Sequence, residues 1–207
     1  MSFRHSPVTF TNRPLLTDTR EGWKVVLQYE DEGGGPFLID LSHLFKWDLQ
    51  HRDLSQIKPA VGEIPESPGY CVLSKGMLTG RLNRTQAMVW HLTTGRPEMP
   101  QEQAVTDVTD AHALFALVGK ELFSIMEKIT PLDLSAPGKA PPFLLQGPVL
   151  HLPVKIVVLG DKGDHSALLV ACTRGYGQSL ADAILDAGTP WGLHPAGEKA
   201  FSPWMKA

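Results

Sequence analysis

The sequence has few cysteines, no long apolar run and no block of like charge. Its two cysteines, Cys71 and Cys172, cannot build a disulfide framework and lack the paired spacing of zinc ligands. No segment approaches the ~20 apolar residues of a membrane span, and the first residues contain no apolar core typical of a secretory signal. We therefore expect a cytoplasmic protein with buried, reduced cysteines and no membrane association.

Charge is nearly balanced, with 19 Lys and Arg against 22 Asp and Glu. A nucleic-acid-binding protein needs a basic face to displace counterions, so we expect no nucleic-acid partner. The 8 histidines show no HxxxH or HExxH spacing, and no G-x-S-x-G elbow is present. The sequence therefore predicts no metal site and identifies no catalytic residue.

The pattern of apolar residues predicts a single α+β domain. Apolar residues make up 43% of the chain, which is enough for a sizeable core. Residues 1–22 carry no periodicity and are expected to form a flexible arm. The domain would then cover residues 23–207, with halves at approximately 23–92 and 104–207 joined by a polar, proline-bearing segment. Extended segments are expected at 23–29, 37–49, 70–73, 87–92, 104–108, 113–118, 149–152, 155–159 and 167–172, and helices at 52–61, 120–129 and 176–187.

The two halves resemble one another. Leu54 and Leu122 match at an offset that also aligns other apolar positions, and with one gap Asp40-Leu-Ser aligns with Asp107-Val-Thr. Each half would run strand, turn, strand, helix, and two such amphipathic units are expected to pack together. Short apolar patterns also coincide by chance, so the sequence leaves the internal repeat open.

The second half carries several motifs in a characteristic order. They are Asp107-Val108-Thr109 at a strand end, Leu117-Val118-Gly119 at a turn, the segment ITPLDLS at 129–135, and Gly192-Leu193 followed by Pro195 and Gly197. Together they resemble the glycine-cleavage T-protein (aminomethyltransferase) family, and the short length and the PLDLS wording are most similar to its relative, the gamma subunit of heterotetrameric sarcosine oxidase. The resemblance implies two related α+β halves around a central cleft. It also implies one-carbon metabolism, with a transferase reaction in which tetrahydrofolate accepts a methylene group.

One departure from that family concerns the cofactor. Where the family has G-E-D-G-F-E, this chain has Gly163-Asp164-His165-Ser166-Ala167, so the glutamate that contacts the pterin is replaced by Ala167. A carboxylate would accept a bidentate, charge-assisted contact there. Without it, buried pterin donors are left unpaired at about 1–3 kcal/mol. The resemblance thus implies tetrahydrofolate, while Ala167 argues against it.

Four residues are candidates for cofactor binding. Arg81, Asn83 and Arg84 lie in TGRLNRTQ between two extended segments, where two guanidinium groups could bind carboxylate or phosphate. The alternative is a solvated turn. Asp107 lies close to Asp110, and a carboxylate pair can serve as acid and base. The alternative is a turn in which the Asp side chain binds a downstream amide.

Three further residues are candidates for a partner interface. Arg174 and Tyr176 lie where the family begins its second helix, which faces the subunit partner in the oxidase, and Trp191 is expected to anchor a core or an interface.

Two candidate functions follow from the sequence. The first is an aminomethyltransferase-like, folate-linked protein. The second is a non-catalytic accessory subunit or adaptor whose partners are oxidoreductase or carrier-protein subunits; a homo-oligomer also fits. We favour the accessory role within that lineage and leave enzymatic activity open.

Overall fold

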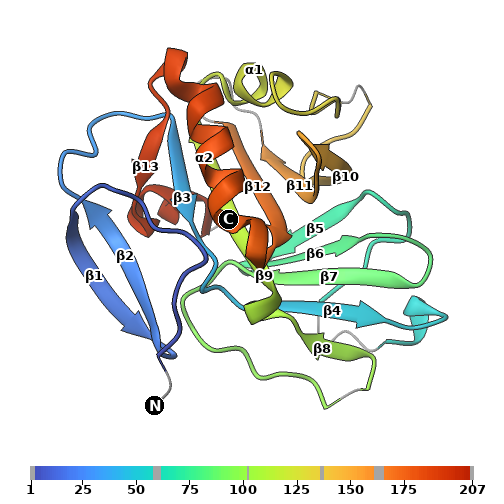
Figure 1. Ribbon diagram of the computed structural model, residues 1–207. Helices are drawn as coiled ribbons and strands as arrows, with labels where there is room; N and C mark the ends of the chain where they lie inside the picture. Colours follow the sequence, from blue (N-terminus) through green and yellow to red (C-terminus); the bar gives the residue numbers. More distant parts are fainter. Residues whose placement is uncertain (1–2, 58–61, 102, 136–137, 161–165, 206–207) are drawn as a thin grey trace.

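Two β-sheets packed face to face, with helices over one of them, make up most of the molecule (Figure 1). The computed structural model describes residues 3–57, 62–101, 103–135, 138–160 and 166–205. The larger sheet has six strands in the order β10-β11-β12-β9-β3-β13, and the smaller sheet has five in the order β5-β6-β7-β4-β8. Strands β1 and β2 form an antiparallel hairpin beside them, at the left of Figure 1.

The regular elements have the following bounds. The strands are β1 (Pro14–Arg20), β2 (Trp23–Tyr29), β3 (Phe37–Asp40), β4 (Lys46–Gln50), β5 (Cys71–Ser74), β6 (Met77–Arg81), β7 (Gln86–His91), β8 (Val105–Asp107), β9 (His112–Gly119), β10 (Phe143–Val149), β11 (Leu152–Gly160), β12 (Ser166–Thr173) and β13 (His194–Ala196). The helices are α1 (Leu122–Glu127), α2 (Gly177–Gly188) and α3 (Ser202–Met205), and the short 3-10 helices are η1 (Leu54–Gln56), η3 (Thr109–Ala111), η4 (Arg174–Tyr176), η5 (Thr189–Trp191) and η6 (Glu198–Phe201).

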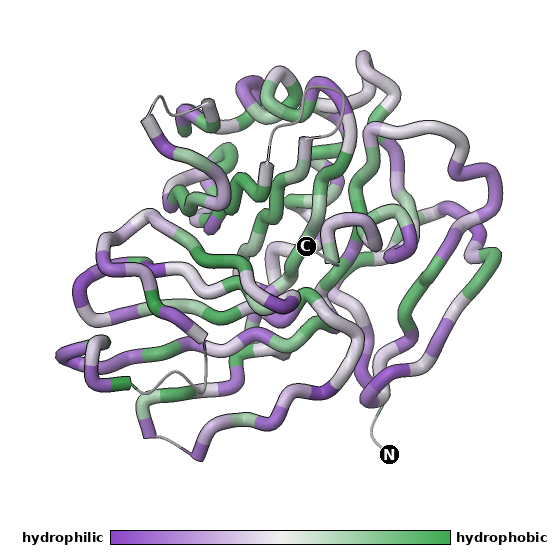
Figure 2. The backbone as a smooth tube through the Cα atoms, turned by 180° about the vertical axis from the view of Figure 1, so that it is seen from behind, coloured by the Kyte–Doolittle hydropathy of each residue, from purple (hydrophilic) through white to green (hydrophobic). Residues whose placement is uncertain are grey.

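Strands β9 and β12 lie at the centre of the molecule and are covered on both faces. On β9, Phe115 and Leu117 pack towards α1 and α2, whereas Leu114 and Ala116 pack towards the smaller sheet. Strand β12 alternates in the same way. Because successive side chains point to opposite faces and both faces are buried, these strands are almost continuously apolar in sequence. Figure 2 shows the hydrophobic residues concentrated along these central strands and hydrophilic residues around the outer loops.

The chain crosses between the two sheets twice, and both crossings begin with the same turn. It leaves the larger sheet after β3 and returns to it between β8 and β9. At the first crossing the carboxylate of Asp40 accepts the amide N–H of Ser42 at 2.9 Å. At the second crossing the carboxylate of Asp107 accepts the amide N–H of Thr109 at 2.8 Å. The aligned Asp-x-Ser/Thr segments therefore occupy equivalent places in the two halves.

The hydroxyl groups of these two turns each bind the opposite crossing. The Ser42 hydroxyl accepts the amide N–H of Leu114 at 3.1 Å, and the Thr109 hydroxyl accepts the amide N–H of Lys46 at 3.0 Å. All four residues are fully or almost fully buried. Since a buried amide without a partner is costly, each of these two turns supplies a hydrogen bond that stabilises the chain next to the other turn.

Several expected elements are confirmed. The amphipathic pattern at 176–187 forms α2, the pattern at 120–129 contains α1, and the mixture of helix and strand is present with far more strand than helix. The extended segment 37–49 is interrupted, because the chain changes sheet between β3 and β4.

Three expectations differ from the structure. The extended segment expected at 149–152 contains the turn between β10 and β11, at residues 150 and 151. The helix expected at 52–61 is limited to the 3-10 turn η1, because Ile57 is already extended with ψ 116°; residues 58–61 lie outside the described ranges. Pro59 also disfavours helix at the residue before it. Within the arm expected at 1–22, residues 14–20 form β1. This strand shows no alternation because nearly all of its side chains are exposed on both faces.

Candidate functional site

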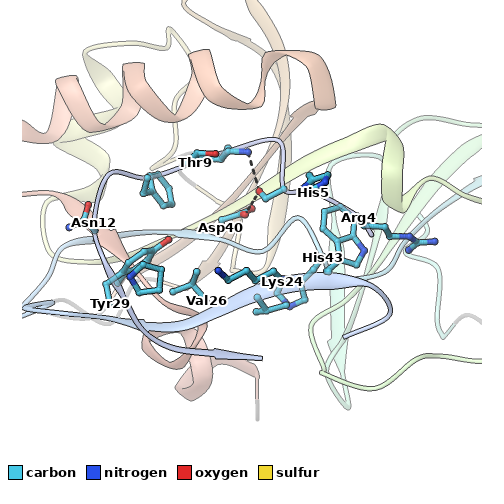
Figure 3. Close-up of a pocket in the computed structure, with 16 residues that line it drawn as sticks. Arg4, His5, Thr9, Asn12, Lys24, Val26, Tyr29, Asp40 and His43 are labelled. Atoms are coloured by element: carbon cyan, nitrogen blue, oxygen red, sulfur yellow. Dashed lines mark hydrogen bonds between the residues drawn. The ribbon is translucent and has the colours of Figure 1, made fainter. Parts of the chain in front are cut away.

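A cavity of about 350 Å³ lies between the N-terminal segment, the hairpin strand β2 and the first crossing (Figure 3). The N-terminal segment covers it, β2 forms one wall, and the residues that follow β3 close it. Its lining combines aromatic rings with charged and polar groups: Arg4, His5, Thr9, Phe10, Asn12, Trp23, Lys24, Val26, Tyr29, Asp40 and His43. This mixture of apolar walls and a few polar groups is typical of small-molecule sites.

The N-terminal segment that covers the cavity is attached to the domain at several points. The amide of Thr9 donates to the side-chain oxygen of Gln178 on α2 at 2.9 Å. The amide of Arg4 donates to the carbonyl of Gly22 at 2.9 Å, and Val8 is buried in the core beneath the helices. These contacts position the lining side chains of this segment over β2.

Asp40 lies at the middle of the cavity and is already hydrogen-bonded. One carboxylate oxygen accepts the hydroxyl of Ser6 and the other accepts the amide of Ser42. Nearby, burial and the charges of Asp40 and Glu32 raise the pKa of Tyr29 well above its ordinary value. The Tyr29 hydroxyl therefore keeps its proton and can donate a hydrogen bond.

A chain of charged groups runs from the surface to His43 at the cavity wall. Arg20 donates to both carboxylate oxygens of Glu198, at 2.8 and 2.6 Å, and also binds Asp18 at 2.8 Å. Glu198 in turn lies 3.2 Å from Nε2 of His43. Burial alone would raise the pKa of Glu198, but hydrogen bonds and charges from His43 and Arg20 outweigh it and lower that pKa. A carboxylate held this way fixes the orientation of the imidazole ring.

Two nitrogen donors behind the cavity wall have no hydrogen-bond partner within the described ranges. They are Nε1 of Trp23 and Nη1 of Arg174. The Arg174 guanidinium stacks over the Trp23 ring at 5.3 Å from the centroid, and its other terminal nitrogen donates to the carbonyl of His5. Buried donors are almost always paired in folded proteins, so these two groups are exceptional.

A fully buried lysine lies at the first crossing, below the cavity. Nζ of Lys46 donates to the carbonyls of Ser42 and Leu44 at 2.8 and 2.7 Å. Burial lowers the pKa of Lys46 to about 7, although nearby aspartates partly oppose the shift. These hydrogen bonds hold the crossing segment in place. Burial disfavours the charged form of the Lys46 amine.

Of the four residues proposed from the sequence for cofactor binding, Arg81, Asn83 and Arg84 share the turn between β6 and β7, and Asp107 lies apart from them. The Arg81 guanidinium donates to carbonyls of its own turn, including those of Asn83 at 3.2 Å and Arg84 at 3.0 Å. The side chain of Asn83 accepts from Thr85 within the same turn. Asp107 lies on β8, three strands away across the smaller sheet, or about 14 Å. Its carboxylate makes the turn contact described above, which was the alternative considered for it.

The three residues proposed for a partner interface lie at the two ends of α2. Arg174 and Tyr176 precede the helix, and the Tyr176 ring is 49% exposed. Trp191 follows the helix, is partly buried against the core, and lies under Nζ of Lys128 at 4.3 Å from the ring centroid. The helix has 12 residues and is about 18 Å long, so the three residues do not form one patch.

The position at which the family has its pterin-contacting glutamate lies in the hydrophobic core of this protein. Ala167 is 0% exposed at the start of β12 and packs among the apolar residues between the two sheets. Residues 163–165, which precede it, lie outside the described ranges. A glutamate side chain at this position would have to enter that apolar layer.

The cavity residues were not identified as a site from the sequence. The one available signal was the Asp40-Leu-Ser segment, which is followed directly by His43. The partner of His43, Glu198, lies far along the chain and has no motif of its own. Within the described ranges, no cluster of three or more His, Cys, Asp or Glu side chains could hold a metal ion. No helix there is long and apolar enough to cross a membrane.

Comparisons with known proteins show one similarity of fold and one similarity of sequence. The mixed, sheet-rich fold matches a chain of the heterotetrameric sarcosine oxidase from Corynebacterium sp. U-96, a structure in complex with pyrrole 2-carboxylate, with a TM-score of 0.62 and 15% sequence identity. The match covers 74% of this chain and 84% of that chain, so the two are of similar length.

In sequence, the chain is 34% identical over 105 residues to the sarcosine oxidase alpha subunit of Rhizobium meliloti (strain 1021). That alignment covers 47% of this chain and spans only about a tenth of the subunit. No protein-family model matches. Both similarities are to sarcosine oxidase chains, which supports a relation to sarcosine oxidase. Neither singles out the glycine-cleavage T-protein or the gamma subunit that the sequence resembles.

Proposed function

We propose that this chain is an accessory subunit of a sarcosine-oxidase-type oxidoreductase complex and has no independent catalysis. The observation that carries the proposal is the fold similarity, over most of both chains, to one chain of a heterotetrameric oxidase. A chain that matches most of one chain of a heterotetramer is expected to work with other chains that hold the redox chemistry. The local similarity to a sarcosine oxidase alpha subunit supports the same lineage.

The packing between the two sheets supports a structural role. The space between the two sheets is filled by buried apolar side chains of both sheets, among them Leu78, Trp90, Leu114, Leu169 and Ala171. An opening of about 20 Å³ lies beside Trp90 and Ala171, and a second opening, of about 250 Å³, shares His112, Lys155 and Ala171 with it. The apolar layer between the sheets stabilises the fold.

The exposed apolar residues support contact with another chain. Leu15 and Leu16 lie on β1, which has one unpaired edge in the two-stranded sheet, and they are 58% and 40% exposed. Phe3, at 81% exposure, and Tyr176 are further exposed apolar residues. Exposed apolar side chains on a strand with a free edge are typical of protein interfaces.

Co-expression tests this role. The chain would be produced with the other sarcosine oxidase subunits from the same genome, and the complex analysed by size-exclusion chromatography with light scattering. We expect co-elution, and sarcosine oxidation only in fractions that contain the partner subunits. Leu16→Lys should weaken co-elution, whereas Leu150→Lys, at a leucine in the β10–β11 turn with 51% exposure against 40% for Leu16, should not. Elution of the chain alone in the presence of every partner would contradict the proposal.

Reduced-folate binding is a second candidate function, favoured by the order of the motifs between residues 107 and 197. Calorimetric titration of the isolated chain with tetrahydrofolate tests it, and saturable heat would support it. Ala167→Glu restores the family carboxylate. Because Ala167 is fully buried, we expect this variant to lose stability rather than gain affinity, and the absence of heat in both proteins would exclude this function.

A further inference from the structure

The cavity beneath the N-terminal segment has two chemically different ends. In Figure 3, Tyr29 and Asn12 lie at one end and Arg4 and His43 at the other, with Lys24 between them. The basic end therefore combines the Arg4 guanidinium, which also lies 3.6 Å from the carboxylate of Asp110, with the His43 imidazole, and the Lys24 ammonium is nearby. Such a distribution suits an elongated ligand whose negative charge is at one end.

Hydrogen bonding in the cavity also favours a ligand that accepts. The lining carboxylate, Asp40, already accepts from Ser6 and Ser42. The Tyr29 hydroxyl remains protonated, as described above. The lining thus offers the donors of Tyr29, Lys24 and Arg4 beside a carboxylate that is already engaged, and an anionic ligand with several lone pairs could accept from them.

The imidazole ring of His43 is held in a fixed orientation at the cavity wall. Its Nε2 is engaged by Glu198 at 3.2 Å, and Glu198 is itself held by both contacts from Arg20. His43 also lines the cavity. A group whose orientation is fixed beforehand loses little entropy on binding.

The opposite end of the cavity is aromatic. Phe10 and Tyr29 meet edge to face, with centroids 6.2 Å apart and planes at 76°. Val26 adds an apolar side chain from β2. A planar, apolar ring is the ligand group that packs best against such a pair.

From these features we propose that the cavity is a binding site for a small organic carboxylate that carries a planar ring. The carboxylate lies at Arg4, Lys24 and His43, and the ring lies against Phe10 and Tyr29. The volume of about 350 Å³ is within the range of small-molecule sites. The site is formed by this chain alone and does not depend on the accessory role, so the two proposals can fail separately.

Titration of the isolated chain tests the site with three probes of equal size: benzoate, benzylamine and benzyl alcohol. Binding is measured by calorimetry and by the indole N–H resonance of Trp23, assigned with Trp23→Phe. We expect benzoate to bind saturably, to shift that resonance, and to bind about tenfold more tightly than the other two. No saturation by benzoate at tens of millimolar, or benzylamine binding as tightly, would overturn the proposal.

Matched variants separate the site from general charge effects. Lys24 is exposed, so Lys24→Gln should leave the fold intact and weaken benzoate binding severalfold. Arg4→Gln should weaken it about tenfold. Arg13→Gln removes an exposed arginine that does not line the cavity and should change nothing. Equal losses in all three variants, with unchanged melting temperatures, would show that benzoate binds through net charge and would refute the site.

Discussion

Replacing the buried Lys46 with methionine should remove a pH dependence of stability that the native protein shows. The lysine is 0% exposed and its Nζ donates only to carbonyl groups. Burial lowers its pKa from 10.5 to about 7. In the unfolded chain the amine stays protonated up to pH ~10, so between pH 7 and that value the unfolded state binds more protons than the folded state.

The sign and size of the change in the free energy of unfolding follow from this difference in bound protons. Because the unfolded state binds more protons, the free energy of unfolding rises with pH. For a lysine with pKa values of 7 folded and 10.5 unfolded, the gain between pH 7 and pH 8.5 is about 1.6 kcal/mol. In a chain of 207 residues this corresponds to about 3–6 °C in Tm. Lys46→Met has no group to deprotonate and should lack the gain.

Urea denaturation at pH 7, 7.5, 8 and 8.5 measures the effect, with the free energy of unfolding compared between native and variant chains at each pH. Staying below pH 9 matters because burial raises the pKa of Cys71 to about 12 and that of Cys172 to about 11. Both thiols ionise first in the unfolded chain and lower stability at higher pH. Lys199→Met, at an exposed lysine, should follow the native curve. If native and Lys46→Met curves stay parallel, the buried amine is not shifted as argued.

Three other substitutions test the contacts described above. Glu198→Ala leaves the Arg20 guanidinium without its bidentate partner and should lower the free energy of unfolding by about 3 kcal/mol; chemical denaturation measures this, and a change below 1 kcal/mol would contradict it. Gly197→Ala places a methyl group 2.3 Å from the backbone carbon of Leu27 and should cost at least ~1–3 kcal/mol, seen as a lower Tm. Thr109→Val leaves a buried amide of the first crossing unpaired and should cost about 1–3 kcal/mol, whereas Thr109→Ser keeps the acceptor and should lose less.

The central strands and the second helix could be predicted because their sequences carry strong local signals. β12 is a run of apolar residues with both faces buried, and α2 has apolar residues at helical spacing ending at Gly188. The Asp-x-Ser/Thr segments were visible as a weak repeat, because the turn they form depends on two residues near each other in sequence.

The cavity could not be predicted because its parts come from distant segments. His43 meets Glu198, and Arg174 meets His5, only after the chain has folded. The strand β1 was missed because its exposed residues lack alternation. Conversely, the density of arginines at Arg81 indicated binding, although the guanidinium serves its own turn. The sequence shows which residues are polar, but tertiary contacts determine which of them line the same cavity.

The position of β3 has a consequence for how the chain folds. In the larger sheet β3 lies between β9 and β13, with Leu38 paired to Leu117 on one side and to Pro195 on the other. Both pairings join segments far apart in sequence, a topology associated with slow folding. During synthesis the apolar strand β3 leaves the ribosome before β9 and β13, so both of its edges are unpaired at first. Until His194 and the residues after it have left the ribosome, one edge of this apolar strand stays unpaired, which favours aggregation of the nascent chain.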